Sequence, residues 1–124
     1  MEKVDNLKVW ESAHNLVLKI YKITKEFPDE ERYRLTDQLC RSSASVPANI
    51  IEGRARKTTK EYLQFLYTAR GSIAETKYHL LLAKDLGYLE GFEYNKIVSG
   101  YDEVGRMLNG LITSLKRKVS NAKP

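Results

Sequence analysis

Cysteine, proline, glycine and histidine are all scarce in this chain of 124 residues. The single cysteine, Cys40, excludes an internal disulfide and a metal site built on several thiolates. With only three prolines and seven glycines, the chain favours long regular elements joined by few irregular loops. No apolar run is long enough to span a membrane, and the first residues lack the apolar segment of a signal peptide. These absences, together with the free thiol, predict a cytoplasmic protein without a membrane partner.

The composition that remains is that of an ordinary globular domain. Apolar residues make up 42% of the chain and charged residues 30%. A chain of this length can bury about two-thirds of its unfolded surface, so we expect one domain over residues 1–124. The formal net charge is +5. This basic bias is compatible with a nucleic-acid partner but does not require one.

Four segments place apolar residues at steps of three and four, and none shows sustained alternation, so the sequence predicts an all-α fold. We expect helices at about residues 7–27, 30–53, 59–86 and 92–119. Because the connections between them are short, we expect an antiparallel up-down-up-down four-helix bundle. The heptad-like spacing in the last two helices predicts left-handed packing.

Several residues are typical of helix ends. Asp29 is a plausible N-cap for the second helix. Thr58 and Glu61 have the spacing of a capping box, in which each side chain binds the other residue's backbone N–H. Gly87 is the expected stop of the third helix.

The stretch from residue 42 to 60 separates the two middle helices. Pro47 lies inside the helical pattern and removes one backbone hydrogen bond, so we expect a kink there. Gly53 is the expected end of this helix. For Asn49 and Glu52 we favour a structural role, in which they satisfy backbone groups near the kink and the turn. The alternative is that Glu52 orients Arg41 or Arg54 toward RNA.

The expected topology gathers positive charge at one end of the bundle, where the chain start, the second turn and the end of the last helix meet. In the turn, four cations exceed two carboxylates by two charges, and the end of the last helix adds four more. The opposite end has an excess of carboxylates. The candidate nucleic-acid-binding residues are Arg54, Arg56, Lys57, Lys60, Lys116, Arg117 and Lys118. In the alternative interpretation these cations only complement helix dipoles and keep the protein in solution.

No catalytic, cofactor or metal site is predicted. A di-iron bundle needs two Glu-x-x-His motifs, and only Glu11 and His14 have that spacing, because His79 follows Glu75 by four residues. No histidine follows an arginine at the spacing used by helical-bundle RNases, and the chain has no phosphate-binding glycine loop. We therefore expect no enzymatic activity.

The third helix carries more apolar surface than a monomeric bundle needs. Tyr67 and Tyr78 lie off its apolar stripe, with further apolar residues beside them at Phe65, Leu81 and Leu82. Self-association is the explanation we favour. The tyrosines are alternatively suited to stack on unpaired bases.

The segment around Pro47 also resembles a known family. It reads Gln38-Leu39-Cys40-Arg41 and then Ser45-Val46-Pro47-Ala48-Asn49-Ile50-Ile51-Glu52-Gly53. Other matching stretches are Val9-Trp10, Phe27-Pro28, Phe65-Leu66, Ala69-Arg70-Gly71-Ser72-Ile73-Ala74-Glu75 and Leu86-Gly87-Tyr88-Leu89. These resemble the four-helix-bundle proteins named after 23S rRNA intervening sequences, with Pro47, Asn49, Glu52 and Gly53 as the structural signature.

That family is similar to the accessory variability determinant of diversity-generating retroelements. The resemblance implies a homopentameric ring, no known enzymatic activity and, for the retroelement relatives, binding of RNA and of a reverse transcriptase. Our leading hypothesis is an oligomeric RNA-binding scaffold, with a reverse-transcriptase accessory as one form of it. The second hypothesis is a protein-binding adaptor that does not bind nucleic acid, and the third and weakest is a metal-dependent enzyme.

Overall fold

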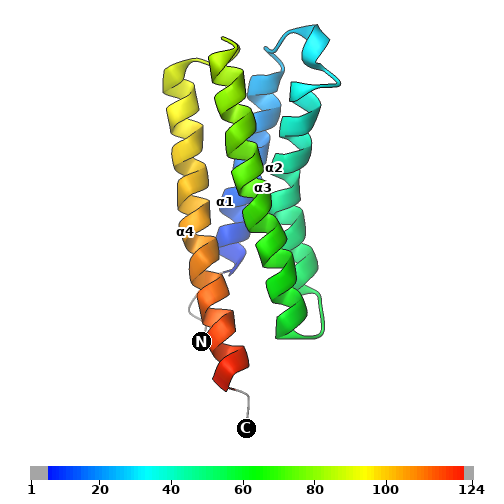
Figure 1. The fold of residues 1–124 in the computed structure, drawn as a ribbon, viewed down its shortest axis with the longest axis vertical. Helices are drawn as coiled ribbons and strands as arrows, with labels where there is room; N and C mark the ends of the chain where they lie inside the picture. Colours follow the sequence, from blue (N-terminus) through cyan, green and yellow to red (C-terminus); the bar gives the residue numbers. More distant parts are fainter. Residues whose placement is uncertain (1–5, 122–124) are drawn as a thin grey trace.

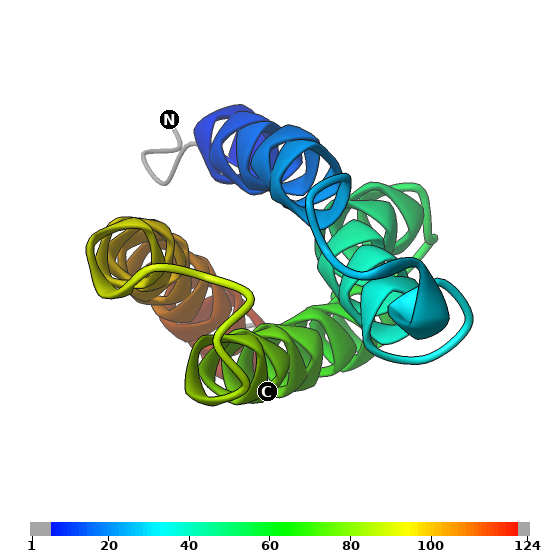
Figure 2. The same ribbon diagram turned by 90° about the horizontal axis from the view of Figure 1, so that it is seen from above.

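The computed structural model describes residues 6–121, which fold into four α-helices and one short 3-10 helix, with no β-strand in that range (Figure 1). The α-helices are α1 (Asn6–Thr24), α2 (Leu35–Arg54), α3 (Thr59–Asp85) and α4 (Gly91–Asn121). Consecutive helices run in opposite directions, and the view along the bundle shows them side by side in chain order (Figure 2). The predicted all-α, up-down-up-down bundle is confirmed.

The core is built from the apolar stripes of the four helices. The residues of α3 that follow Tyr62 at three- and four-residue steps are buried from Leu66 to Ala83, whereas Tyr62 itself is half-buried. In α4 the stripe from Ile97 to Leu111 is buried as well, and it includes the large side chain of Tyr101. The packing between α2 and α3 is the most extensive of the helix pairs. These two helices flank the basic turn and therefore position it.

The first connection differs from the prediction. Helix α1 ends at Thr24 instead of residue 27, and α2 begins at Leu35 instead of residue 30, with a 3-10 helix at Asp29–Glu31 between them. Asp29 therefore does not cap α2. Instead, the buried carboxylate of Glu31 accepts a hydrogen bond of 3.2 Å from the backbone N–H of Leu35, the first residue of α2. The same carboxylate accepts a hydrogen bond of 2.8 Å from the Tyr88 hydroxyl. This carboxylate ties the first connection to the third.

Both predicted ends of α3 are confirmed. Thr58 accepts a hydrogen bond from the Glu61 N–H at 3.1 Å, and the Glu61 carboxylate accepts one from the Thr58 N–H at 3.3 Å. At the other end Gly87 has a φ of 85°, a conformation that favours glycine. The N–H groups of Gly87 and Tyr88 bind the carbonyls of Lys84 and Ala83, which is the Schellman arrangement.

Helix α2 runs without interruption through Pro47 and past Gly53 to Arg54. The predicted stop at Gly53 is wrong by a short margin, and the residue has another role. A Cβ atom at Gly53 would lie 2.7 Å from the Cβ of Phe65 and 2.9 Å from a ring carbon of Tyr62. Gly53 is therefore the point where α2 approaches α3 too closely for a side chain. The kink at Pro47 stays a prediction.

Candidate nucleic-acid interface

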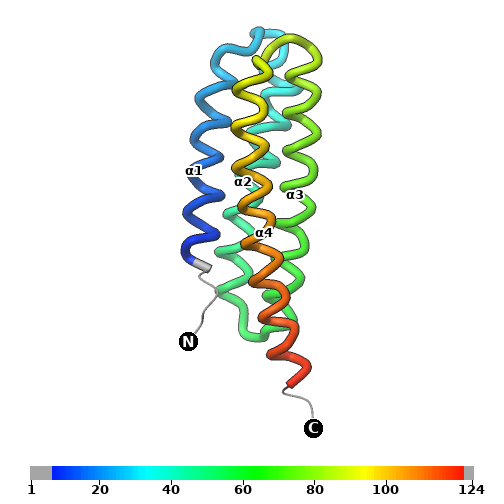
Figure 3. Tube along the Cα trace, turned by 90° about the vertical axis from the view of Figure 1, so that its left-hand side faces the viewer, coloured from blue at the N-terminus to red at the C-terminus, as the bar shows by residue number. Residues whose placement is uncertain are grey.

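The α2–α3 turn and the end of α4 lie at the same end of the bundle, and the last turns of α4 extend past the turn (Figures 1 and 3). We call this the basic end. It carries all seven cations that the sequence singled out, and each of them is exposed: Arg54, Arg56, Lys57, Lys60, Lys116, Arg117 and Lys118. The topology thus brings the two predicted groups of cations together. Their role in RNA binding stays a prediction.

The seven cations differ in what surrounds them. Arg56 forms an ion pair with Glu52 at 3.3 Å, and its guanidinium lies 4.6 Å from the centre of the Phe65 ring. Within residues 6–121 the other six form no ion pair with a carboxylate. Glu52 therefore neutralises Arg56, and it pairs with neither Arg41 nor Arg54. Among the described residues, six of the cations therefore have no carboxylate partner that would compete with an anion.

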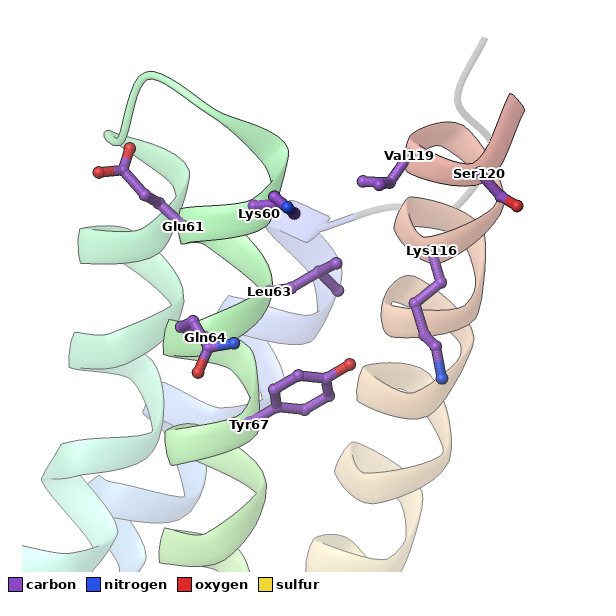
Figure 4. A pocket seen from close by; sticks show the side chains of 8 residues that line it. All are labelled: Lys60, Glu61, Leu63, Gln64, Tyr67, Lys116, Val119 and Ser120. Carbon is purple, nitrogen blue, oxygen red and sulfur yellow. The ribbon is translucent and has the colours of Figure 1, made fainter. Parts of the chain in front are cut away.

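A groove of about 500 Å³ opens at the basic end between α3 and α4 (Figure 4). We call it the α3–α4 groove. Leu63 and Tyr67 from α3 and Val119 from α4 point into it, and Lys60 and Lys116 stand on its two sides. Its remaining lining residues are Glu61, Gln64 and Ser120. Lys60 of the α2–α3 turn and Lys116 of the end of α4 therefore lie on opposite sides of the same apolar floor.

Tyr67 is held in place on the floor of this groove. The guanidinium of Arg70 lies 5.2 Å from the centre of the Tyr67 ring, and it donates a hydrogen bond of 3.0 Å to the side-chain carbonyl of Asn109 in α4. Arg70 thus links the ring to the neighbouring helix. A ring fixed in this way loses little conformational freedom when a ligand packs against it.

Small hydroxyl side chains of α2, beside the signature residues, form a polar seam with α3. The amide of Asn49 donates to the backbone carbonyl of Ser45 at 2.8 Å, and the Ser45 hydroxyl lies 2.8 Å from that of Ser72. Further along, the buried hydroxyl of Thr76 lies 2.8 Å from that of Ser42. The Asn49 contacts lie within α2, so the structural role expected of this residue stays a prediction, and Glu52 binds no backbone group in the described residues. Small hydroxyl side chains allow the close approach of the two helices and satisfy each other there.

The residues proposed for self-association divide into two groups. Tyr67 and Leu82 are only partly exposed because they pack against the core, and Phe65 is partly covered by Arg56. Tyr78 and Leu81 remain 56% and 38% exposed. Other large apolar side chains are exposed elsewhere, on α1, near the first and third helix connections and at the end of α2: Leu7, Leu18, Tyr21, Tyr33, Ile51, Leu86 and Phe92.

The residues considered for chemistry lie apart from one another. The His14 ring stacks on Trp10 with centres 5.2 Å apart, and His79 lies 3.2 Å from the carboxylate of Glu75. Residues 6–121 contain no group of three histidine, cysteine or acidic side chains placed to hold a metal. Burial raises the pKa of the Cys40 thiol, which disfavours the reactive thiolate.

Comparison with known proteins gives the chain a family. A model of the family described as "23S rRNA-intervening sequence protein" matches residues 5–110. The chain belongs to this family. A solved structure of a protein of unknown function from the S23 ribosomal protein family of Bacteroides thetaiotaomicron superposes with a TM-score of 0.81 at 23% identity. The alignment covers 87% of this chain and 97% of that one, so the family fold extends over nearly the whole bundle. No curated protein gives a significant match.

The family resemblance read from the sequence is therefore correct, and the family match ends inside α4, before the cations at the end of that helix. None of the helices within residues 6–121 combines the length and apolar character that crossing a membrane requires. The α3–α4 groove was missed by reasoning from sequence. A signal for it exists, because Val119 follows Leu115 by four residues and so continues the apolar stripe of α4 beyond its buried part.

Proposed function

We propose that this protein is a non-enzymatic, oligomeric scaffold that binds RNA through its basic end. The observation that supports this most is the charge there, since six exposed cations from the α2–α3 turn and the end of α4 lack a carboxylate partner in the described residues. Cations in such an arrangement bind phosphates and release the condensed counterions of a nucleic acid. The binding is sequence-independent to the extent that it relies on phosphates alone.

Helix dipoles account for only part of this charge. Lys116, Arg117 and Lys118 lie at the C-terminal end of α4, where cations are favourable. Lys60 lies in the first turn of α3, and Lys57 directly precedes its cap. Cations at a helix N-terminus face its positive end and are unfavourable there. A ligand that brings negative charge explains the position of Lys57 and Lys60 better than the dipole does.

Self-association is the second part of the proposal. The family resemblance implies a ring of five copies, and exposed apolar side chains such as Tyr78 and Leu18 are available for an interface. If the copies are parallel, their basic ends share one face of the ring and their fields add. A cytoplasmic accessory to a reverse transcriptase is one setting for such a ring. Native mass spectrometry tests the number of copies directly.

The test of RNA binding is a charge-removal variant with a matched control. The variant replaces Arg54, Arg56, Lys57 and Lys60 by alanine. The control replaces Lys22, Lys25, Arg32 and Lys96, which are exposed and lie toward the opposite end, so both variants lose the same charge. The probe is a short hairpin RNA with an unpaired loop, titrated at several salt concentrations.

We expect the first variant to bind more weakly and with a flatter salt dependence. Each phosphate contact adds about 0.7 to 0.9 to the slope of log K against log salt, so losing three or four contacts lowers it by about 2 to 4. Because Glu52 neutralises Arg56, restoring Arg56 alone is expected to recover little. Equal binding by the wild type and the first variant would refute this assignment of the site.

The exposed apolar side chains also suit a second function, that of a protein-binding adaptor without nucleic-acid affinity. In that case neither variant changes partner capture, and the wild type does not bind the hairpin. An alanine at Tyr78 would then weaken the protein complex.

A further inference from the structure

The α3–α4 groove has the size and the surface of a ligand site. Small-molecule sites in proteins have volumes of about 300 to 1,000 Å³, with mainly apolar walls and a few polar groups. The groove measures about 500 Å³, and its floor consists of Leu63, Tyr67 and Val119. One nucleotide fits such a space. A base inside a duplex does not reach it, because both faces of the base are stacked and its Watson–Crick edge is paired.

The charge around the groove selects an anion. Lys60 and Lys116 stand on opposite sides, one from each helix (Figure 4). The one carboxylate among the lining residues belongs to Glu61, and it is turned toward the helix cap, where it accepts the N–H and hydroxyl of Thr58. The groove therefore presents positive charge at its sides and an apolar surface below.

The remaining side chains suit a planar polar ring. Tyr67 offers an aromatic surface whose position Arg70 fixes, and aromatic surfaces of this kind stack on unpaired bases. Gln64 also lines the groove, and its exposed amide has both donors and an acceptor for the edge of a base. A simple anion would use the lysines but not this floor, and an apolar peptide would use the floor but not the lysines.

We propose that the α3–α4 groove binds one unpaired nucleotide of the RNA, with the base against Tyr67 and the adjoining phosphates at Lys60 and Lys116. This inference rests on the proposed RNA-binding function and sharpens it, because it assigns a preference for single-stranded or looped RNA. Phosphate contacts alone give no such preference.

The test compares three RNA probes of equal length: an unstructured single strand, the same strand with abasic residues in place of its nucleotides, and a blunt duplex. The first two have the same backbone charge and differ only in their bases. The variant is Tyr67→Leu, which keeps an apolar side chain and removes the aromatic face. Its control is Tyr94→Leu, because Tyr94 also lies beside a cation from α3, with the Lys84 ammonium 5.2 Å from its ring centre, but lies at the opposite end.

We expect the wild type to prefer the intact single strand over both other probes. The Tyr67→Leu variant should lose roughly 5- to 150-fold in affinity for the intact strand, the range given by one base–aromatic stack, and nothing for the abasic strand. The Tyr94→Leu variant should bind like the wild type. Equal affinity of the wild type for intact and abasic strands would overturn the inference while leaving RNA binding in place. Failure to bind any of the three probes would overturn both.

A second variant keeps the test informative if Tyr67→Leu unfolds the end of the bundle. Val119 lies near the end of α4, and Val119→Phe fills the groove from that side. It should lower affinity for the intact strand selectively. If it instead changes the sedimentation of the free protein and leaves RNA binding unaltered, the groove is an interface with a second copy and the inference is wrong.

Photo-crosslinking locates the contact on the chain. A thiouridine-labelled single strand should attach within the tryptic peptide Glu61–Arg70, which contains Tyr67. Attachment to α1 peptides instead would contradict the site. Crosslinking in the Tyr67→Leu protein should fall in proportion to the lost affinity.

Discussion

Gly53→Ala tests whether a single missing side chain sets the separation of α2 and α3. The added Cβ would lie 2.7 Å from the Cβ of Phe65 and 2.9 Å from a ring carbon of Tyr62. Carbon atoms pack best at about 3.5 to 4.0 Å, so both distances are short by roughly 0.6 Å or more. The Phe65 Cβ is attached to the backbone and cannot rotate away. The two helices must therefore move apart, or Tyr62 must leave its position.

Two effects of opposite sign determine the size of the change. Overpacking of a close contact costs about 1 to 3 kcal/mol. Alanine in place of glycine within a helix regains about 0.5 to 1 kcal/mol. We expect the free energy of unfolding to fall by up to about 2.5 kcal/mol, which is the cost of overpacking less the gain in helix propensity. Without the close contact the substitution would stabilise the protein.

Urea denaturation followed by circular dichroism measures this change. The control is Gly71→Ala, because Gly71 lies on the exposed side of α3 and a Cβ there meets nothing within 4 Å. That variant should gain about 0.5 to 1 kcal/mol from helix propensity alone. If Gly53→Ala is as stable as Gly71→Ala, the close approach of α2 and α3 does not exist in solution.

Two further predictions concern other parts of the bundle. In Gly100→Ala the new Cβ would lie 2.8 Å from a terminal methyl group of Leu16, and this methyl group can rotate away. The free energy of unfolding in the same urea titration should therefore fall by less than in Gly53→Ala, by below about 1 kcal/mol. An equal fall in the two variants would show that Leu16 cannot move. The hydrogen bond to Glu31 raises the pKa of Tyr88 above its ordinary 10.0. The folded state therefore holds the hydroxyl proton of Tyr88 more tightly than the unfolded state does. The hydrogen bond to Glu31 contributes fully to stability below the unfolded-state pKa, and this contribution is lost as the pH rises through the folded-state pKa. Between about pH 9 and about pH 11, the free energy of unfolding measured by urea denaturation should therefore fall less in Tyr88→Phe than in the wild type. Equal falls would contradict a stabilising hydrogen bond between Tyr88 and Glu31.

The helices were predictable because their signals are local and repeated. The α3 stripe recurs over many turns, and both of its ends carry the side chains their caps require, Thr58 with Glu61 and then Gly87. The first connection was not predictable from such signals. Its geometry depends on Glu31, whose carboxylate binds Tyr88 from 57 residues along the chain. In sequence, the acidic run after Pro28 resembles the first turn of an α-helix. Only the contact with Tyr88, which is distant in sequence, shows that the run belongs to a 3-10 connection instead.

The candidate site was predictable as charge but not as shape. Connecting the helices in order is enough to place Lys60 and Lys116 at one end, because alternate turns of such a bundle share an end. The groove between them depends on how far α4 extends past the α2–α3 turn and on where Val119 points (Figures 3 and 4). No motif encodes the first, and the four-residue step from Leu115 to Val119 continues the apolar stripe without fixing the shape of the groove. Partial neutralisation of Arg56 by Glu52 is likewise a matter of side-chain position, although their four-residue spacing permits it.

The family signature and the proposed contact surface are adjacent in sequence but act differently. Gly53 sets how closely α2 approaches α3, whereas Lys57 and Lys60 lie just beyond that contact, are exposed and form no ion pair in the described residues. Because the turn starts where the close packing ends, a wider separation of the helices displaces these cations as well. Changes in the signature should therefore lower stability and RNA affinity together, while changes in the turn lower affinity alone. Measuring both quantities for each variant separates the two roles, which neither measurement does by itself.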